Sequence, residues 1–219
     1  MTILNTSIPV IIETGADEWP YSVRGTFFTI KIGGESYVVT ARHVVHGNDE
    51  NTVFFRYKNN SRFSLPLDQE IKNTSYMDES SPEYTDIILY RINKNETDEE
   101  FISIDLNLSE TPWERLSKGD NLVIRGYPSE LQKVLDSGVK EQAVIINAKY
   151  LNRAVTENCH DIELFPTETF TFHDGYSGSP VFLKKNSDFK FAGILIKADS
   201  FNNKGLFVDA SVLLKMVNS

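Results

Sequence analysis

His43 follows an apolar run and has the side chain best suited to proton transfer near neutral pH. The run, Tyr37-Val38-Val39-Thr40-Ala41, predicts a buried strand that ends just before the histidine, with a brief helical turn after it. An imidazole on so rigid a mount could act as a general base. A lone histidine beside an apolar strand is more often structural, so this segment alone leaves both interpretations open.

Asp86 stands immediately before a second apolar run, Ile87-Ile88-Leu89-Tyr90. A carboxylate at the start of a buried strand is poorly solvated and needs a hydrogen-bond partner. It could cap a turn. It could instead orient an imidazole and stabilise the imidazolium that forms when that base takes a proton.

A glycine-rich turn, Gly175-Tyr176-Ser177-Gly178-Ser179-Pro180, precedes a third apolar strand. Glycines at both sides of the serine allow a tight turn that no Cβ obstructs. Such a turn can direct the N–H groups of Gly175 and Ser177 at one point, as an oxyanion hole for acyl transfer requires. The Ser177 hydroxyl would then be the nucleophile. A Gly/Ser-rich hairpin turn is the simpler alternative.

The elements that must position these residues are predicted to be short strands separated by turn residues. This pattern indicates an all-β barrel or sandwich. A helix is predicted only at 210–217, with Asp209 as its N-cap. The predicted strands are rich in Val, Ile, Phe, Tyr and Thr and cover 25–32, 35–40, 52–57, 86–92, 121–125, 142–150, 161–164, 180–183, 189–197 and 205–208.

Composition excludes several classes of function. The 219 residues include 22 Lys and Arg against 31 Asp and Glu, a net charge of −9 that argues against nucleic-acid binding. The single cysteine, Cys159, allows no intrachain disulfide and is interpreted as structural. With four histidines outside any metal-binding motif and no phosphate-binding loop, neither metal nor cofactor is expected. His160 and His173 are interpreted as surface or loop residues.

The sequence also contains no apolar run long enough to cross a membrane, and no membrane partner is expected. The first residues, Met1-Thr2-Ile3-Leu4-Asn5, lack the basic and apolar regions of a signal peptide. A cytoplasmic location is therefore predicted.

Taken together, the three segments resemble the signature motifs of trypsin/chymotrypsin-like serine proteases, in that family's order of His, Asp and Ser. The segment Arg125-Gly126-Tyr127-Pro128 is similar to a strand end of bacterial trypsin-like peptidases, such as glutamyl-endopeptidase and HtrA-type enzymes. The segment Phe191-Ala192-Gly193-Ile194 is similar to the strand that lines their substrate cleft.

The resemblance implies an all-β, chymotrypsin-like fold of two packed antiparallel six-stranded barrels with a short C-terminal helix. Residues 1–110 would form the barrel carrying His43 and Asp86, and residues 111–219 the barrel carrying Ser177 and the helix. It also implies a serine endopeptidase that works through a Ser-His-Asp triad and an acyl-enzyme, with Gly175 and Ser177 as the oxyanion hole. The substrate would be a polypeptide.

For substrate binding, the resemblance points to four consecutive residues and one pocket residue. The peptide would add as a strand along Ile194, Leu195, Ile196 and Lys197. Thr171 would form the base of the primary pocket. Thr171 carries no charge, and Leu195 stands where glutamyl endopeptidases place a histidine. A small or apolar residue before the scissile bond is therefore expected.

Tyr176 departs from the digestive enzymes, which place an aspartate before the nucleophile to pair with a newly freed N-terminus. Activation by chain cleavage is therefore not expected. If activity is conditional, we expect another route of control: an activating or regulatory protein, oligomerisation or the ordering of a loop. The alternative is a catalytically latent protease-like module that binds peptides or regulates a partner. The two differ in whether His43 lies within hydrogen-bond reach of both Asp86 and Ser177.

Overall fold

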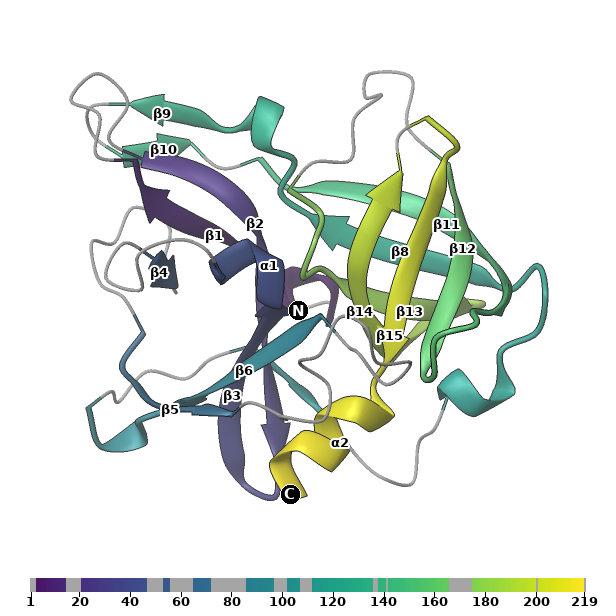
Figure 1. Ribbon diagram of the computed structural model, residues 1–219, viewed down its shortest axis with the longest axis horizontal. Helices are drawn as coiled ribbons and strands as arrows, with labels where there is room; N and C mark the ends of the chain where they lie inside the picture. Colours follow the sequence, from purple (N-terminus) through teal and green to yellow (C-terminus); the bar gives the residue numbers. More distant parts are fainter. Residues whose placement is uncertain are drawn as a thin grey trace.

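The computed structural model consists of an N-terminal sheet, a C-terminal barrel and a terminal helix that packs against the sheet (Figure 1). The structure describes residues 3–14, 21–46, 53–55, 65–71, 86–96, 102–106, 112–135, 138–140, 142–165, 175–199 and 201–218.

The N-terminal sheet has seven strands, in the order β4-β1-β2-β3-β6-β5, with β7 pairing in parallel to β2. Its central strands are apolar on both faces, and six of the seven residues of β3 are buried. The sheet is therefore covered on both sides, as its near-continuous apolar runs require. Its strands are β1 (Ile8–Glu13), β2 (Tyr21–Ile32), β3 (Glu35–Ala41), β4 (Val53–Phe55), β5 (Leu67–Ile71), β6 (Ile87–Ile92) and β7 (Ser103–Asp105).

The C-terminal half forms a closed barrel in the order β11-β12-β15-β14-β13-β8, with β8 pairing back to β11. Residues of all six strands meet inside it, among them Leu122, Ile146, Ile162 and Phe207. Because the barrel is closed, each of its strands pairs with a neighbour on both sides along at least part of its length. The strands are β8 (Asn121–Gly126), β11 (Val144–Arg153), β12 (Cys159–Phe165), β13 (Pro180–Lys185), β14 (Asp188–Asp199) and β15 (Lys204–Asp209).

The C-terminal helix α2 (Ser211–Asn218) follows β15 directly and joins the two halves. Its buried residues Val212, Leu213 and Met216 belong to the same core as the N-terminal sheet. The shorter elements are η1 (Ile3–Thr6), α1 (Arg42–Val45), η4 (Lys94–Glu96), η5 (Pro112–Arg115), η6 (Ser129–Leu131) and the hairpin of β9 (Lys133–Leu135) and β10 (Gly138–Lys140).

The all-β prediction is confirmed, and each predicted strand matches an observed one, although residues 52, 56 and 57 of the predicted 52–57 lie outside the described part. The C-terminal helix is also confirmed, and the Asp209 carboxylate accepts a hydrogen bond from its first amide, Ser211 N–H, at 2.9 Å. Strand β1 was not predicted because its run, which contains Pro9, lacks alternation. Strand β5 was missed because its middle residues are polar.

One closed barrel is observed where the sequence predicted two. Within the described residues, the terminal strands of the first sheet, β4 and β5, do not pair with each other. The closure of this sheet stays a prediction. No helix in the described part of the chain is long and apolar enough to cross a membrane.

Candidate active site

His43 and Asp86 are brought together by the pairing of β3 with β6. Ala41 lies opposite Ile87 in this ladder, so the residues just beyond each strand end become neighbours. The chain turns into α1 at Arg42, whose N–H donates to the Asp86 carbonyl at 3.0 Å. Two elements distant in sequence thus place a histidine and a carboxylate side by side.

The Asp86 carboxylate uses both of its oxygens on His43. Oδ1 accepts the His43 backbone N–H at 2.9 Å, and Oδ2 is hydrogen-bonded to the ring Nδ1. Because a carboxylate can only accept, Nδ1 is the protonated nitrogen, and the neutral ring has its lone pair on Nε2. The Asp86 side chain is 12% exposed and that of His43 is 51% exposed, so the ring lies between the carboxylate and solvent.

The turn around Ser177 is held by backbone hydrogen bonds to the barrel and within itself. Gly178 N–H donates to Leu195 O at 2.8 Å, and Ser179 N–H donates to Tyr176 O at 2.9 Å. No described residue accepts a hydrogen bond from the N–H of Gly175 or Ser177.

The glycines of this turn are required both by torsion and by space. Gly175 has φ +91° and Gly178 has φ +85°, values that other residues adopt only with strain. A Cβ on Gly175 would lie 2.3 Å from Tyr127 O, and one on Gly178 would lie 2.0 Å from Thr26 O. The segment containing Tyr127 therefore packs directly against the serine turn.

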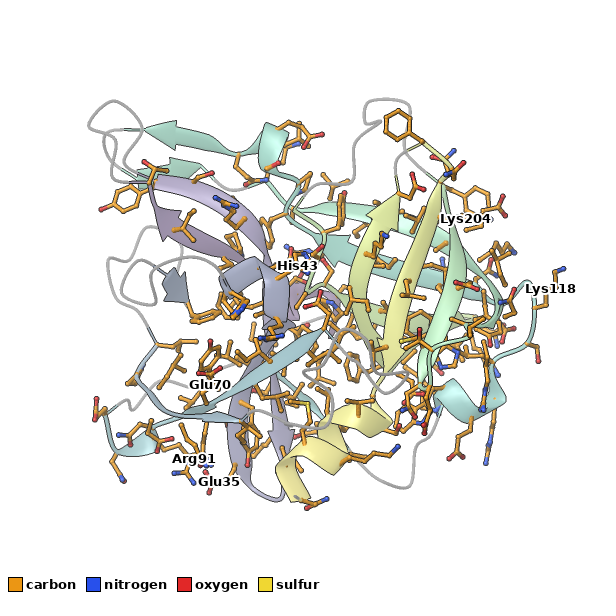
Figure 2. The ribbon with its side chains drawn as sticks, viewed as in Figure 1. Glu35, His43, Glu70, Arg91, Lys118 and Lys204 are labelled. Carbon is orange, nitrogen blue, oxygen red and sulfur yellow. The ribbon has the colours of Figure 1, made fainter. Side chains whose placement is uncertain are left out.

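His43, Asp86 and Ser177 line one cleft of about 480 Å³. Figure 2 shows His43 between the N-terminal sheet and the barrel. Among the contacts of the described residues there is no hydrogen bond between Ser177 and His43. The cleft is lined by His43, Asp86, Thr156, Cys159, Ser177, Ile196, Lys197, Ala198 and Leu206.

Two of the five predicted substrate-binding residues, Ile196 and Lys197, line this cleft. The side chains of Ile194 and Leu195 do not line it, since they are 0% and 1% exposed and belong to the hydrophobic cores. A bulge between Leu195 and Lys197 in the β14–β15 ladder changes which side chains face inward. Thr171 lies outside the described residues.

Four residues of the cleft were not predicted: Thr156, Cys159, Ala198 and Leu206. They come from the β11–β12 connection, β12, β14 and β15, which the barrel pairing brings together. No local motif marks them. Of the four, only Ala198 could have been anticipated from the sequence, because it directly follows the predicted substrate-binding segment that ends at Lys197.

Burial changes the acid–base properties of two residues near the site. It raises the pKa of the Cys159 thiol to about 12, with smaller contributions from Asp209 and Asp161. The cysteine is thus a neutral wall of the cleft. Burial also raises the pKa of the Tyr176 hydroxyl, with Glu130 contributing. A neutral, fully buried tyrosine therefore stands before Ser177.

The interpretation of His160 as a surface or loop residue was wrong. His160 is 1% exposed and lies in β12, opposite Phe207 of β15, on whose ring it stacks. Its Nε2 is 3.2 Å from Asp209 Oδ2, and its Nδ1 is 3.3 Å from the Tyr150 hydroxyl. These partners satisfy an imidazole inside the barrel wall. His173 lies outside the described residues.

No cluster of metal-ligating side chains occurs in the described part of the chain. The sequence model of the family described as the trypsin-like peptidase domain matches residues 25–194. This match covers most of the chain, including His43, Asp86 and Ser177, and the chain belongs to this family. The search of curated proteins found no individual protein that matches this chain.

Proposed function

We propose that this protein is a serine endopeptidase in which Ser177, His43 and Asp86 form the catalytic triad. The observation that carries the proposal is the bidentate contact of Asp86 with His43, in a cleft that Ser177 also lines. Membership of the trypsin-like peptidase family supports peptide-bond hydrolysis.

In the proposed reaction, Ser177 Oγ attacks the substrate carbonyl carbon while its proton passes to His43 Nε2. The resulting oxyanion accepts hydrogen bonds from the N–H groups of Gly175 and Ser177. The C–N bond then breaks as His43 returns the proton to the leaving amine. Water attacks the acyl-enzyme by the same steps, with His43 again as base, and frees the serine.

The substrate would bind as an extra strand on β14. Strand β13 pairs with β14 only as far as Ile194, whereas β15 pairs with it as far as Asp199. Among the described residues, one edge of the 196–199 segment therefore has no strand partner, and this edge begins beside Ser177 in the cleft. Main-chain hydrogen bonds to this edge would align a polypeptide of many sequences. The apolar side chains of Ile196 and Leu206 favour a small or apolar residue near the scissile bond.

The proposal includes the remaining expectations from the sequence. The first sheet would close into a second six-stranded barrel, with the halves meeting near residue 110. The protein would act in the cytoplasm. Tyr176 offers no carboxylate to a freed N-terminus, so control would take another route: a regulatory protein, oligomerisation or the ordering of a loop.

The test is labelling with a fluorophosphonate, which reacts with activated serines. Wild type should be labelled at Ser177, identified by mass spectrometry, and Ser177→Ala should not be labelled although it folds. Ser187→Ala, which alters an exposed serine, is the matched control and should label like wild type. Absence of labelling in folded wild type, with or without peptide ligands, would overturn the proposal.

A second candidate is a latent module that binds peptides without cleaving them. The absence of a Ser177–His43 hydrogen bond among the described contacts favours it. Catalytic hydrogen bonds are often long in unliganded enzymes, so this observation carries less weight than the Asp86–His43 geometry. Peptides that bind to wild type and Ser177→Ala equally, and are never cut, would identify the latent module.

A further inference from the structure

We propose that Thr26 is a positioning residue for the nucleophile turn, holding the carbonyl groups of Gly175 and Ser177 from the opposite half of the molecule. Thr26 lies in β2 of the N-terminal sheet and is 0% exposed. This inference rests on the proposed function, because it assigns a role in the same reaction.

Thr26 makes two hydrogen bonds to the turn. Its backbone N–H donates to Ser177 O at 2.9 Å, and its Oγ1 donates to Gly175 O at 2.8 Å. The two residues that supply the proposed oxyanion donors are thus each held through their carbonyl oxygen. Each carbonyl belongs to the peptide plane that follows its residue, Gly175–Tyr176 or Ser177–Gly178. Fixing it limits rotation of the plane on the C-terminal side of the donor and so restricts the orientation of the turn.

The direction of the Thr26 hydroxyl is set by a third hydrogen bond. Tyr127 N–H donates to Thr26 Oγ1 at 3.0 Å. Since a hydroxyl has one proton, an oxygen that accepts from a fixed backbone amide offers that proton to Gly175 O. The threonine therefore links the strand end after β8 to the glycine of the turn.

Thr26 itself is held on its other side. Thr40 Oγ1, from the strand that leads to His43, donates to Thr26 O at 2.8 Å. The same carbonyl would lie 2.0 Å from a Cβ on Gly178, so the turn and β2 are in close contact. One buried network thus connects the strand carrying the base to the turn carrying the nucleophile. Buried polar networks of this kind restrict a site to one arrangement.

The side-chain part of this role predicts a specific loss of rate. Thr26→Val keeps the shape of the side chain and removes the hydroxyl, leaving Gly175 O and Tyr127 N–H without this partner. Small misplacement of a reacting group costs up to about 100-fold in rate, so we expect a loss of about 10- to 100-fold. The loss should appear in kcat and in the fluorophosphonate rate constant, with KM changed less than about threefold.

The matched control is Thr29→Val. Thr29 is another buried threonine of β2, and its Oγ1 donates to a backbone carbonyl, Ile102 O, at 3.0 Å, away from the turn. It should lower stability like Thr26→Val and leave the rates near wild type. Thr26→Ser keeps the hydroxyl and should restore the rate to within about threefold. Equal rates for Thr26→Val and wild type, or equal losses in both Thr26 variants, would overturn the inference.

A readout that does not depend on catalysis separates this inference from the proposed function. Amide hydrogen exchange of Gly178 and Ser179 should be at least about tenfold faster in Thr26→Val than in Thr29→Val, whether or not the protein labels. Unchanged exchange refutes the inference even in an active enzyme. If Thr26→Val does not fold, Thr26→Cys, with its weaker S–H donor, takes its place and should show a smaller change in the same direction.

Discussion

Replacing Asp86 with asparagine should abolish most of the proposed activity while leaving the fold intact. The carboxylate currently accepts two hydrogen bonds from His43, one from the backbone N–H and one from Nδ1. An asparagine has one carbonyl oxygen and one NH2 group, so it cannot accept both. The His43 backbone N–H can only donate, so it will hydrogen-bond to the side-chain carbonyl oxygen of the asparagine.

The NH2 group of the Asp86→Asn side chain would then face His43 Nδ1 and favour the tautomer protonated at Nε2. That ring cannot accept the Ser177 proton, and the positive charge formed in the reaction loses its carboxylate. Errors of tautomer and charge in such triads cost about 10⁴-fold, close to 5 kcal/mol of the activation free energy. Stability should fall by only about 1–2 kcal/mol, the cost of one altered hydrogen bond.

The assay compares fluorophosphonate labelling rates of wild type and Asp86→Asn at neutral pH, with thermal unfolding measured in parallel. Asp68→Asn is the matched control, because Asp68 also accepts two hydrogen bonds, from Arg91 at 2.8 and 3.2 Å. Arg91 lies at the far end of the sheet from His43 (Figure 2). A folded Asp86→Asn protein that labels within tenfold of wild type would refute the role assigned to Asp86.

Three further outcomes are expected. Gly178→Ala should lose at least about 2 kcal/mol of unfolding free energy and most of its fluorophosphonate labelling. Gly33→Ala is the control, because Gly33 also has a positive φ but has open space around it. It should lose about 1 kcal/mol and label like wild type. Lys197→Glu should shift cleavage away from substrates with acidic residues near the scissile bond by about fivefold, as peptide-library profiling would show, and Lys184→Glu outside the cleft should not. Burial raises the pKa of Cys159 from 9.0 to about 12. The neutral thiol therefore makes its full contribution to the free energy of unfolding below pH 9. Stability should then fall by up to about 1.4 kcal/mol per pH unit as the unfolded thiol ionises. Denaturant titrations of Cys159→Ala between pH 8 and 11 should lack this part of the slope.

Much of the candidate site could be predicted because its residues are marked by their immediate neighbours. His43 and Asp86 stand at the borders of apolar strands, and the position of a strand end depends mainly on local residues. The turn at Ser177 is marked by glycines whose positive φ the structure shows to be necessary. These signals depend on short-range sterics and alternation, which a linear sequence contains.

The sequence did not predict all the residues that line the cleft. The bulge in β14 decides that Lys197 faces the cleft while Leu195 enters the core, and a shift of one residue reverses every following side chain. His160 looked like a surface residue because Asp209 and the stacked ring of Phe207 come from β15, which is distant in sequence and pairs with β12 only in the folded barrel.

The sequence by itself therefore determined the β class, the terminal helix, the family and the residues that carry the proposed chemistry. Only the tertiary structure decided which side chains share the cleft, and that Thr26 reaches across to Gly175 and Ser177. The physical reason is range. Strand propensity and turn torsion depend on neighbouring residues, whereas a hydrogen bond between residues 149 positions apart depends on how two halves of the chain pack together.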